Sequence, residues 1–115
     1  MDYYYRPIGG GIEFGESGSS ALIREIQEEI KADITDIKYL GTIENIFTYN
    51  GDTGHELVMV YDATFVNKSF YQTEFLEGVE DDGSTFKLFW KPLSGFQNGR
   101  LRLDPKSLLE LIKVV

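Results

Sequence analysis

Three glutamates stand at positions i, i+3 and i+4 of one segment, namely Glu25, Glu28 and Glu29. In a helix this spacing projects all three carboxylates from one side. Like charges so placed repel each other by roughly a few tenths of a kcal/mol per pair, and a hard divalent cation removes that repulsion. Magnesium prefers oxygen ligands and is commonly held by one or two carboxylates together with substrate phosphates. The spacing therefore fits a divalent-metal site, although such a run taken alone is more often a solvated helix face.

A run of three glycines, Gly9-Gly10-Gly11, precedes these glutamates. Glycine carries no side chain, so the backbone of this loop can come close to a metal ion or a phosphate group. The chain has no cysteine and a single histidine, so a metal ion would be held by oxygen atoms or by His55.

The segment that must position the carboxylates is predicted to be a helix over residues 19–30. Its apolar residues recur at i, i+4 and i+8 as Leu22, Ile26 and Ile30, with Ile23 beside them. Such a stripe is wide enough to dock on a sheet. The run Ser17-Gly18-Ser19-Ser20 offers several N-cap candidates just before the helix. The carboxylates flank the stripe, so we expect them at the edge of the buried face, where a cleft can form.

An antiparallel hairpin is predicted next. Residues 34–47 and 55–65 are rich in Ile, Val, Tyr and Phe, and the strong turn signal Asn50-Gly51 lies between them. Residues 67–83 are polar and acidic and are interpreted mostly as loop, whereas residues 85–90 alternate like a further strand.

Short elements are predicted at the two ends of the chain. The aromatic, β-prone run Tyr3-Tyr4-Tyr5 predicts a short strand that leads into the glycine loop. Near the other end, Asp104-Pro105 places a capping residue directly before a proline suited to the first helical position. A closing helix is therefore expected after it.

Length and composition bound the class of protein. A chain of 115 residues is the size of one domain, so residues 1–115 are expected to form a single domain. The sequence contains no apolar run of spanning length and no secretory signal, and the lack of cysteine favours the cytoplasm. The formal net charge of -8 argues against a nucleic-acid partner, because binding there depends on Lys and Arg. If an acidic protein handles phosphate, a cation should mediate it.

Residues 9–32, GGGIEFGESGSSALIREIQEEIKA, resemble the Nudix box, which is written G-x5-E-x7-R-E-U-x-E-E-x-G-U with U a bulky aliphatic residue. The positions that fall on it in register are Gly10, Glu16, Arg24, Glu25, Ile26, Glu28 and Glu29. With each fixed letter at roughly one in 15, six in register arise by chance on the order of once in ten million start positions. A plain solvated face is therefore a poor account of the whole segment.

Two positions depart from the box: Lys31 stands where the last glycine is usual, and Ala32 is small where a bulky aliphatic is usual. That glycine would cap the helix in a left-handed conformation, which lysine adopts at a cost of roughly 1 kcal/mol. We expect local strain or a shifted helix end, with the carboxylates spared.

The resemblance implies an α/β fold, a Nudix-type α/β/α sandwich built around a mixed β-sheet. It implies that Glu28 and Glu29 are the main ligands of Mg²⁺, with Mn²⁺ as the alternative ion. Glu25 is then either a third ligand or the base that orients the attacking water. The implied reaction is divalent-metal-dependent hydrolysis of a phosphoanhydride bond in a nucleoside diphosphate linked to another moiety.

Further roles are implied for residues around the cluster. Arg24 would hold one of the carboxylates through a charge-assisted hydrogen bond. Glu16 would brace the loop against the helix, and the carbonyl of Gly9 or Gly10 would complete the metal shell. Families of this fold often add an acidic residue from a late loop, which here is Glu80 as a further metal ligand.

Each of the less specific candidates has a structural alternative. Glu77 is the second choice for the late acidic residue, and the whole acidic stretch that also holds Asp81 and Asp82 reads equally well as a solvated loop. His55 begins a strand, where a lone histidine is more often structural. The tyrosines at 3–5 and Phe47 could stack on a base, although core packing is their more usual task.

Nudix domains normally carry a longer segment ahead of the box than the nine residues found here, so the fold is expected to be N-terminally truncated. A homodimer that completes the sheet would compensate for the missing strand. The alternative to an active hydrolase is a catalytically impaired Nudix-fold module that binds nucleotides or regulates.

Overall fold

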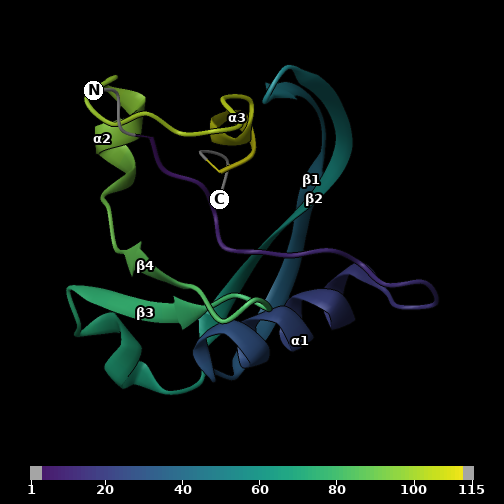
Figure 1. Cartoon of the computed structure of the whole chain (residues 1–115). Coiled ribbons are helices and arrows are strands. Elements are labelled where there is room, and N and C mark those ends of the chain that lie inside the picture. The colour runs from purple at the N-terminus through teal and green to yellow at the C-terminus, as the bar shows by residue number, and fades with distance from the viewer. Residues whose placement is uncertain (1–3, 113–115) are drawn as a thin grey trace. The chain divides into compact units, whose positions relative to one another are not determined.

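The computed structural model describes residues 4–112, so Tyr3 of the expected N-terminal strand lies outside the described residues. The chain folds into two compact units (Figure 1). Unit 1 consists of the segment that ends at Pro7, the segment Lys38–Asp62 and the segment that starts at Pro92. Unit 2 consists of Ile8–Ile37 and Ala63–Lys91. The complete glycine loop and all the glutamates of the predicted metal site therefore belong to unit 2.

Helix α1, Gly18–Ile30, forms the centre of unit 2 and confirms the predicted helix. Its N-terminus is capped by Ser17, whose side-chain oxygen accepts a hydrogen bond from the backbone N–H of Ser20 at 3.2 Å. Its C-cap is Lys31, which adopts the left-handed conformation with φ 56° and ψ 39°. The helix thus ends where the last glycine of the box would end it.

The apolar stripe of α1 packs as its spacing predicts. Ile26 and Ile30 are buried together with Ala32, and the partly buried residues around them include Leu22. The others in this group are Ile8, Ile34, Phe65, Phe70, Leu76 and Leu88. Ile23 was expected in the stripe, but it is 47% exposed because it lies one residue, about 100° of helical rotation, away from Leu22.

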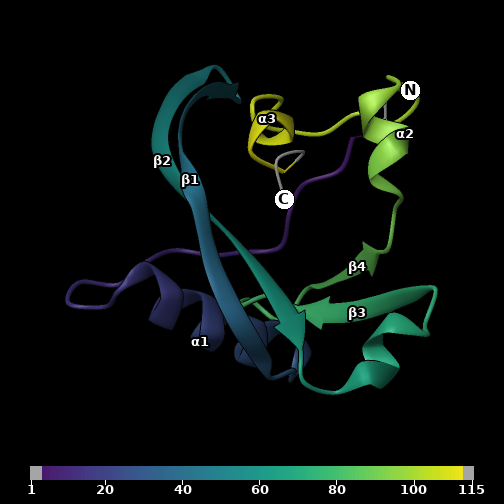
Figure 2. The same ribbon diagram turned by 180° about the vertical axis from the view of Figure 1, so that it is seen from behind.

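Strands β1, Ile34–Tyr49, and β2, Asp52–Phe65, form the predicted hairpin. The turn residues Asn50 and Gly51 have φ values of 51° and 84°, the left-handed pair that the tightest hairpin turns require. Figure 2 shows the two strands running side by side up to this turn.

The loop predicted over residues 67–83 is partly wrong, because the segment contains a short 3-10 helix, Lys68–Tyr71, and strand β3, Phe75–Val79. β3 pairs antiparallel with β4, Thr85–Phe89, which was predicted. The pairing places Leu76 opposite Leu88 and Gly78 opposite Phe86. Gly78 leaves the space that the Phe86 ring occupies, and this face of the hairpin packs on α1.

Unit 1 has its own apolar contacts, with Ile43 and Leu108 buried and the side chain of Leu111 lying against Gly41. Helix α2, Leu93–Gln97, was not predicted. The closing helix α3, Leu108–Ile112, exists but begins later than predicted, so the expected cap at Asp104 was wrong. The backbone N–H of Asp104 instead donates to the carbonyl of Tyr5, and the helix is preceded by a turn in which the N–H of Leu108 donates to the carbonyl of Pro105.

Tyr5 confirms only a fragment of the predicted N-terminal strand, since among residues 4–112 it forms an isolated parallel bridge with Leu103. Strands β1 and β2 form one two-stranded sheet and β3 and β4 form another. The α/β class expected from the sequence is confirmed. Side chains alternate along β3, and one face of this strand packs on α1. Together these two features determine which acidic side chains come close to one another.

Candidate metal centre and active site

The three glutamates of α1 differ strongly in burial. Glu29 is only 8% exposed, and the side chain of Glu25 is 13% exposed. The side chain of Glu28 is 51% exposed. Glu25 and Glu29 therefore lie deeper than the predicted edge of the apolar face, and a buried carboxylate requires a compensating partner.

Glu80 reaches the same place from the β3–β4 hairpin. Successive side chains of a strand alternate, so Leu76, Gly78 and Glu80 project from the face that packs on α1. The hydrogen bond from the backbone N–H of Glu80 to the carbonyl of Ser84, 2.8 Å long, continues the pairing beyond the end of β3. The late acidic residue expected from the sequence thus faces the helix that carries the box.

Several neighbouring carboxylates act on Glu29. Burial, followed by the negative charges of Glu80 and Glu25 and a smaller share from Asp81, raises the pKa of Glu29 to about 7. Repulsion among carboxylates held apart from water is the condition that a bound cation relieves. Asp81 was interpreted only as part of a solvated loop, and no sequence pattern marked its proximity to Glu29.

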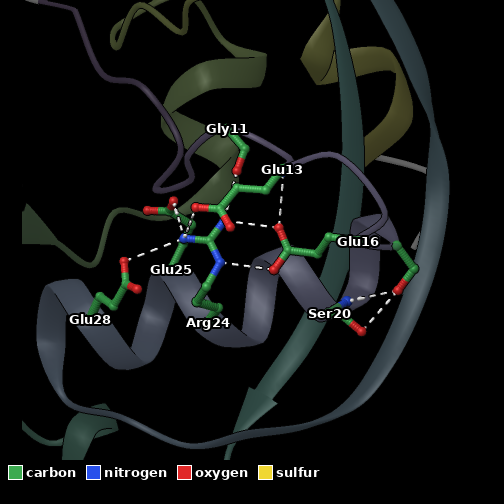
Figure 3. A network of polar contacts seen from close by, with 8 residues as sticks. Gly11, Glu13, Glu16, Ser20, Arg24, Glu25 and Glu28 are labelled. Carbon is green, nitrogen blue, oxygen red and sulfur yellow. Dashed lines mark hydrogen bonds and ion pairs between the residues drawn. The ribbon is translucent and has the colours of Figure 1, made fainter.

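Arg24 is the cation of this cluster (Figure 3). Its Nε and Nη2 donate to the two carboxylate oxygens of Glu16 at 2.8 and 2.9 Å, a bidentate pair. Its Nη1 donates to Oε1 of Glu25 at 2.9 Å and to Oε2 of Glu28 at 3.4 Å. Nη2 also donates to the carbonyl of Gly11 at 2.9 Å. One guanidinium therefore ties the glycine loop to the helix and orients Glu25, as the box resemblance implied.

Glu16 is held by the loop as well as by Arg24. Its Oε1 accepts from the backbone N–H of Glu13 at 3.0 Å, and its own N–H donates to the Glu13 carbonyl at 3.0 Å. The hydrogen bond from Arg24 and the contact with the Glu13 backbone lower the pKa of Glu16 to about 2. The hydrogen bonds to Glu16 and Glu25 raise the pKa of Arg24, so both Glu16 and Arg24 stay charged at neutral pH. Glu13, whose carboxylate lies 4.0 Å from Nη1 of Arg24, was not singled out from the sequence.

Of the two candidate loop glycines, Gly10 touches the cluster. A Cβ built on Gly10 would overlap the carboxylate of Glu25, whereas a Cβ on Gly9 would meet nothing within 4 Å. The close approach of bare backbone expected from the glycine run is therefore present at Gly10. That either carbonyl binds metal stays a prediction.

Lys31 occupies the left-handed cap that the missing glycine of the box would occupy. Its backbone N–H donates to the Gln27 carbonyl at 3.0 Å, and its Nζ donates to the Glu28 carbonyl at 3.0 Å. Of the two outcomes expected at this position, local strain is confirmed and a shifted helix end is not.

The donor set fits a hard cation, because every candidate ligand is a carboxylate or carbonyl oxygen and Glu29 lies in an excess of negative charge. Within residues 4–112, however, no three His, Asp or Glu side chains converge closely enough to hold a metal ion as they stand. Arg24 contacts Glu25 and Glu28 in this arrangement. Their role as ligands, together with that of Glu29 and Glu80, stays a prediction.

The remaining candidates favour their structural alternatives. Glu77 stands opposite Lys87 on the face of β3 turned away from α1, so it does not join the cluster. His55 is more than half exposed and its Nε2 lies 2.8 Å from Oε2 of Glu44. The ring of Phe47 covers Gly54, and Tyr5 packs edge-on against Phe96.

Fold and site together define an α/β protein whose loop-helix segment gathers carboxylates around one arginine. The NUDIX domain family matches residues 3–111, which is nearly the whole of the 115-residue chain. The chain belongs to the Nudix family. No curated protein matches the sequence. Membership supports a function of the Nudix hydrolase type, in a family that generally uses divalent metals and acts on small molecules derived from nucleotides.

Proposed function

We propose that this protein hydrolyses a phosphoanhydride bond in a nucleoside diphosphate linked to another moiety, and that it requires Mg²⁺, with Mn²⁺ as a possible substitute. The observation that carries the proposal is the buried carboxylate of Glu29, on the helix that bears the Nudix box, whose pKa is raised by burial and by the negative charges of Glu80 and Glu25. A folded protein has little reason to keep such mutual repulsion unless a cation joins the group.

Glu28 and Glu29, with Glu25 and Glu80, are the residues that would hold the ion. A divalent cation bound there neutralises charge on the diphosphate and makes a water molecule more acidic. Arg24 remains charged and fixes the orientation of Glu25 through its 2.9 Å hydrogen bond. The bare backbone at Gly10 leaves room for that carboxylate.

We assign the base to Glu25, because its side chain is the least exposed of the glutamates that Arg24 contacts. In the reaction, the oxygen of a water molecule forms a bond to phosphorus while Glu25 takes up its proton. The bond from phosphorus to the bridging oxygen breaks, and the leaving phosphate keeps that electron pair. The products are two phosphate-bearing fragments, one of them a nucleoside monophosphate.

The partner in this proposal is a small nucleotide derivative. The charge of -8 argues against a nucleic-acid substrate, and the cytoplasm is the compartment that a cysteine-free sequence favours. No helix in residues 4–112 is long and apolar enough to cross a membrane.

A substrate screen tests the proposal. Nucleoside triphosphates, nucleotide sugars, ADP-ribose, dinucleoside polyphosphates and NADH are incubated with the protein and Mg²⁺, then with Mn²⁺, and the release of a monophosphate is measured. The matched control is Glu29→Gln. Activity on one class that is lost in the control supports the proposal, and no turnover of any class with either ion contradicts it.

A catalytically impaired module that binds nucleotides or regulates is the second candidate. The observation that favours it is the arrangement of the acidic side chains, which Arg24 contacts and which do not converge on one point within the described residues. Binding of Mg²⁺ and nucleotide in calorimetry without any turnover in the same samples would identify this function.

A further inference from the structure

An asparagine or aspartate precedes a glycine at three places in the sequence: Asn50-Gly51, Asp82-Gly83 and Asn98-Gly99. Each of these glycines is left-handed, with φ of 84°, 88° and 81° in that order. Because glycine has no side chain, its backbone nitrogen can approach the side-chain carbonyl carbon of the residue before it. The two atoms can then bond and close a five-membered succinimide ring. In the folded protein this reaction depends on what holds the two reacting groups.

Asn98-Gly99 is held at both reacting groups. The side-chain oxygen of Asn98 accepts a hydrogen bond from the backbone N–H of Arg100 at 3.0 Å. The backbone N–H of Gly99 donates to the carbonyl of Phe96 at 3.4 Å. Ring closure requires the side chain to rotate over the nitrogen and the nitrogen to lose its proton. Both hydrogen bonds therefore oppose the reaction at Asn98.

Asp82-Gly83 is held in the same way. Oδ1 of Asp82 accepts from the hydroxyl of Ser84 at 2.6 Å and from its backbone N–H at 2.9 Å. The N–H of Gly83 donates to the carbonyl of Glu80 at 2.9 Å. The hydrogen bonds from Ser84 also lower the pKa of Asp82, so its carboxylate stays ionised and resists attack by a nucleophile.

Asn50-Gly51 has neither restraint. It lies between the ends of β1 and β2, at the turn of the hairpin (Figure 2), and both residues are exposed. Within residues 4–112, no hydrogen bond reaches the side chain of Asn50 or the N–H of Gly51. A Cβ built on Gly51 would meet nothing within 4 Å, so the ring and a water molecule have room there. Both reacting groups are therefore available at this turn.

We propose that Asn50 is a site of spontaneous deamidation in the folded protein. The nitrogen of Gly51 gives up its proton and forms a bond to the side-chain carbonyl carbon of Asn50. The bond from that carbon to the amide nitrogen breaks, and the amide nitrogen takes up a proton and leaves as ammonia. Water then adds to one of the two carbonyl carbons of the succinimide and breaks its bond to the ring nitrogen. The product is an aspartate or an isoaspartate.

Both products change the hairpin. Each adds one negative charge to a chain whose net charge is already -8, and it does so two residues before Asp52. In an isoaspartate the main chain also runs through one additional carbon atom. The tightest hairpin turns require two left-handed residues in fixed positions, so the longer main chain does not fit this turn. Deamidation would thus make the chain more acidic with time and loosen the end of the hairpin.

The two Asn-Gly dipeptides provide a comparison within one molecule. Folded wild-type protein is kept for several weeks at mildly alkaline pH, and peptides that contain Asn50 or Asn98 are then quantified by mass spectrometry. Each deamidation adds about 1 Da. Conversion at Asn50 should exceed that at Asn98 by about tenfold or more, because only Asn98 is restrained. It should also accelerate as the pH rises, because the attacking nitrogen must lose its proton.

The same incubation in a denaturant is the control, because unfolding removes the hydrogen bonds of Asn98 and leaves two Asn-Gly dipeptides of the same chemistry. The two sites should then convert at similar rates. Equal rates at Asn50 and Asn98 in the folded protein would overturn the proposal. So would a folded protein in which Asn50 stays intact while the unfolded protein converts.

Ion-exchange chromatography provides the second measurement. Wild type should accumulate a more acidic form with time, and Asn50→Gly should reduce that form by about fivefold or more, because glycine keeps the left-handed turn but has no amide to lose. Asn98→Gly is the matched control and should behave like wild type. An Asn50→Gly protein that becomes acidic as fast as wild type would overturn the proposal. Neither readout depends on hydrolysis of a nucleotide, so a failure here is separate from a failure of the proposed function.

Discussion

The backbone of Gly10 lies against the carboxylate of Glu25, so closely that a Cβ at position 10 would overlap that carboxylate. The obstacle is the end of a flexible side chain, and neither backbone nor core would have to move. A substitution at Gly10 should therefore disturb the site far more than the fold.

Gly10→Ala should cut the proposed hydrolysis by at least tenfold and weaken Mg²⁺ binding, because Glu25 must leave the position in which Arg24 holds it. The melting temperature should change little. Gly9→Ala is the control, since a Cβ there meets nothing within 4 Å. Calorimetry with Mg²⁺ and the substrate assay check both variants, and equal behaviour of the two would contradict the role given to Gly10.

Glu29→Gln tests the metal centre and should separate function from folding. It should weaken Mg²⁺ binding by at least tenfold and reduce hydrolysis by two or more orders of magnitude, because the metal, water and phosphate lose alignment together. Calorimetry and the substrate assay measure these effects. If wild type and variant bind the ion equally, Glu29 is not a ligand.

The same substitution should stabilise the metal-free protein, and the gain should depend on pH. The pKa of Glu29 is raised from an ordinary value of 4.5 to about 7 in the folded state. The unfolded chain therefore ionises first, and wild-type stability falls as the pH rises from about 4.5 to about 7. The gain in stability of Glu29→Gln over wild type should be absent near pH 4 and complete above pH 7. Melts across this range check it, with the exposed Glu28→Gln as the control.

Glu16→Gln should loosen the glycine loop because it removes the bidentate partner of Arg24. The pKa of Glu16 is lowered to about 2, so its contribution to stability is present above about pH 4.5 and is lost as the pH falls through 2. The variant should therefore melt lower than wild type at pH 6, and the gap should close toward pH 2. Glu13→Gln, at a carboxylate 73% exposed and 4.0 Å from Arg24, should have a much smaller effect.

Lys31→Gly should stabilise the protein by up to about 1 kcal/mol, because glycine adopts the left-handed cap without strain. Part of that gain is offset by loss of the hydrogen bond from the Lys31 ammonium to the Glu28 carbonyl. Lys31→Ala loses the same bond and keeps the strain, so it should be less stable than wild type. Thermal melts of the three proteins give their order of stability. A glycine variant that melts no higher than wild type would contradict the prediction.

The parts of the fold with a strong local signal could be predicted from the sequence. Helix α1 followed from its apolar spacing and its serine cap, and the β1–β2 hairpin followed from Asn50-Gly51. Strand β3 was missed because Glu77 and Gly78 break the usual strand composition. Gly78 is needed for a reason visible only in three dimensions, namely that the Phe86 ring fills the space beside it.

For the candidate site, the box register identified the helix glutamates and Arg24 but not their different environments. The burial of Glu29 results from the packing of β3 on α1, and its pKa is raised by that burial and by the charge of Glu80, which is 51 residues further along the chain. The contact of Glu13 with Arg24 could have been suspected from its place three residues before Glu16. Such long-range effects lie in the tertiary structure and leave no periodic signal.

The hairpin turn at Asn50-Gly51 also bears on how the chain finds its fold. Unit 2 is made of two segments separated by Lys38–Asp62, and closing an unstructured loop of that length costs about 3 kcal/mol in chain entropy. If β1 and β2 pair progressively from the turn, Asp33 and Val66 are brought side by side. The 3.0 Å hydrogen bond between them can then form without the closure of a long unstructured loop. Replacing Gly51 should therefore slow folding of the distant acidic cluster, although no residue of the turn touches it.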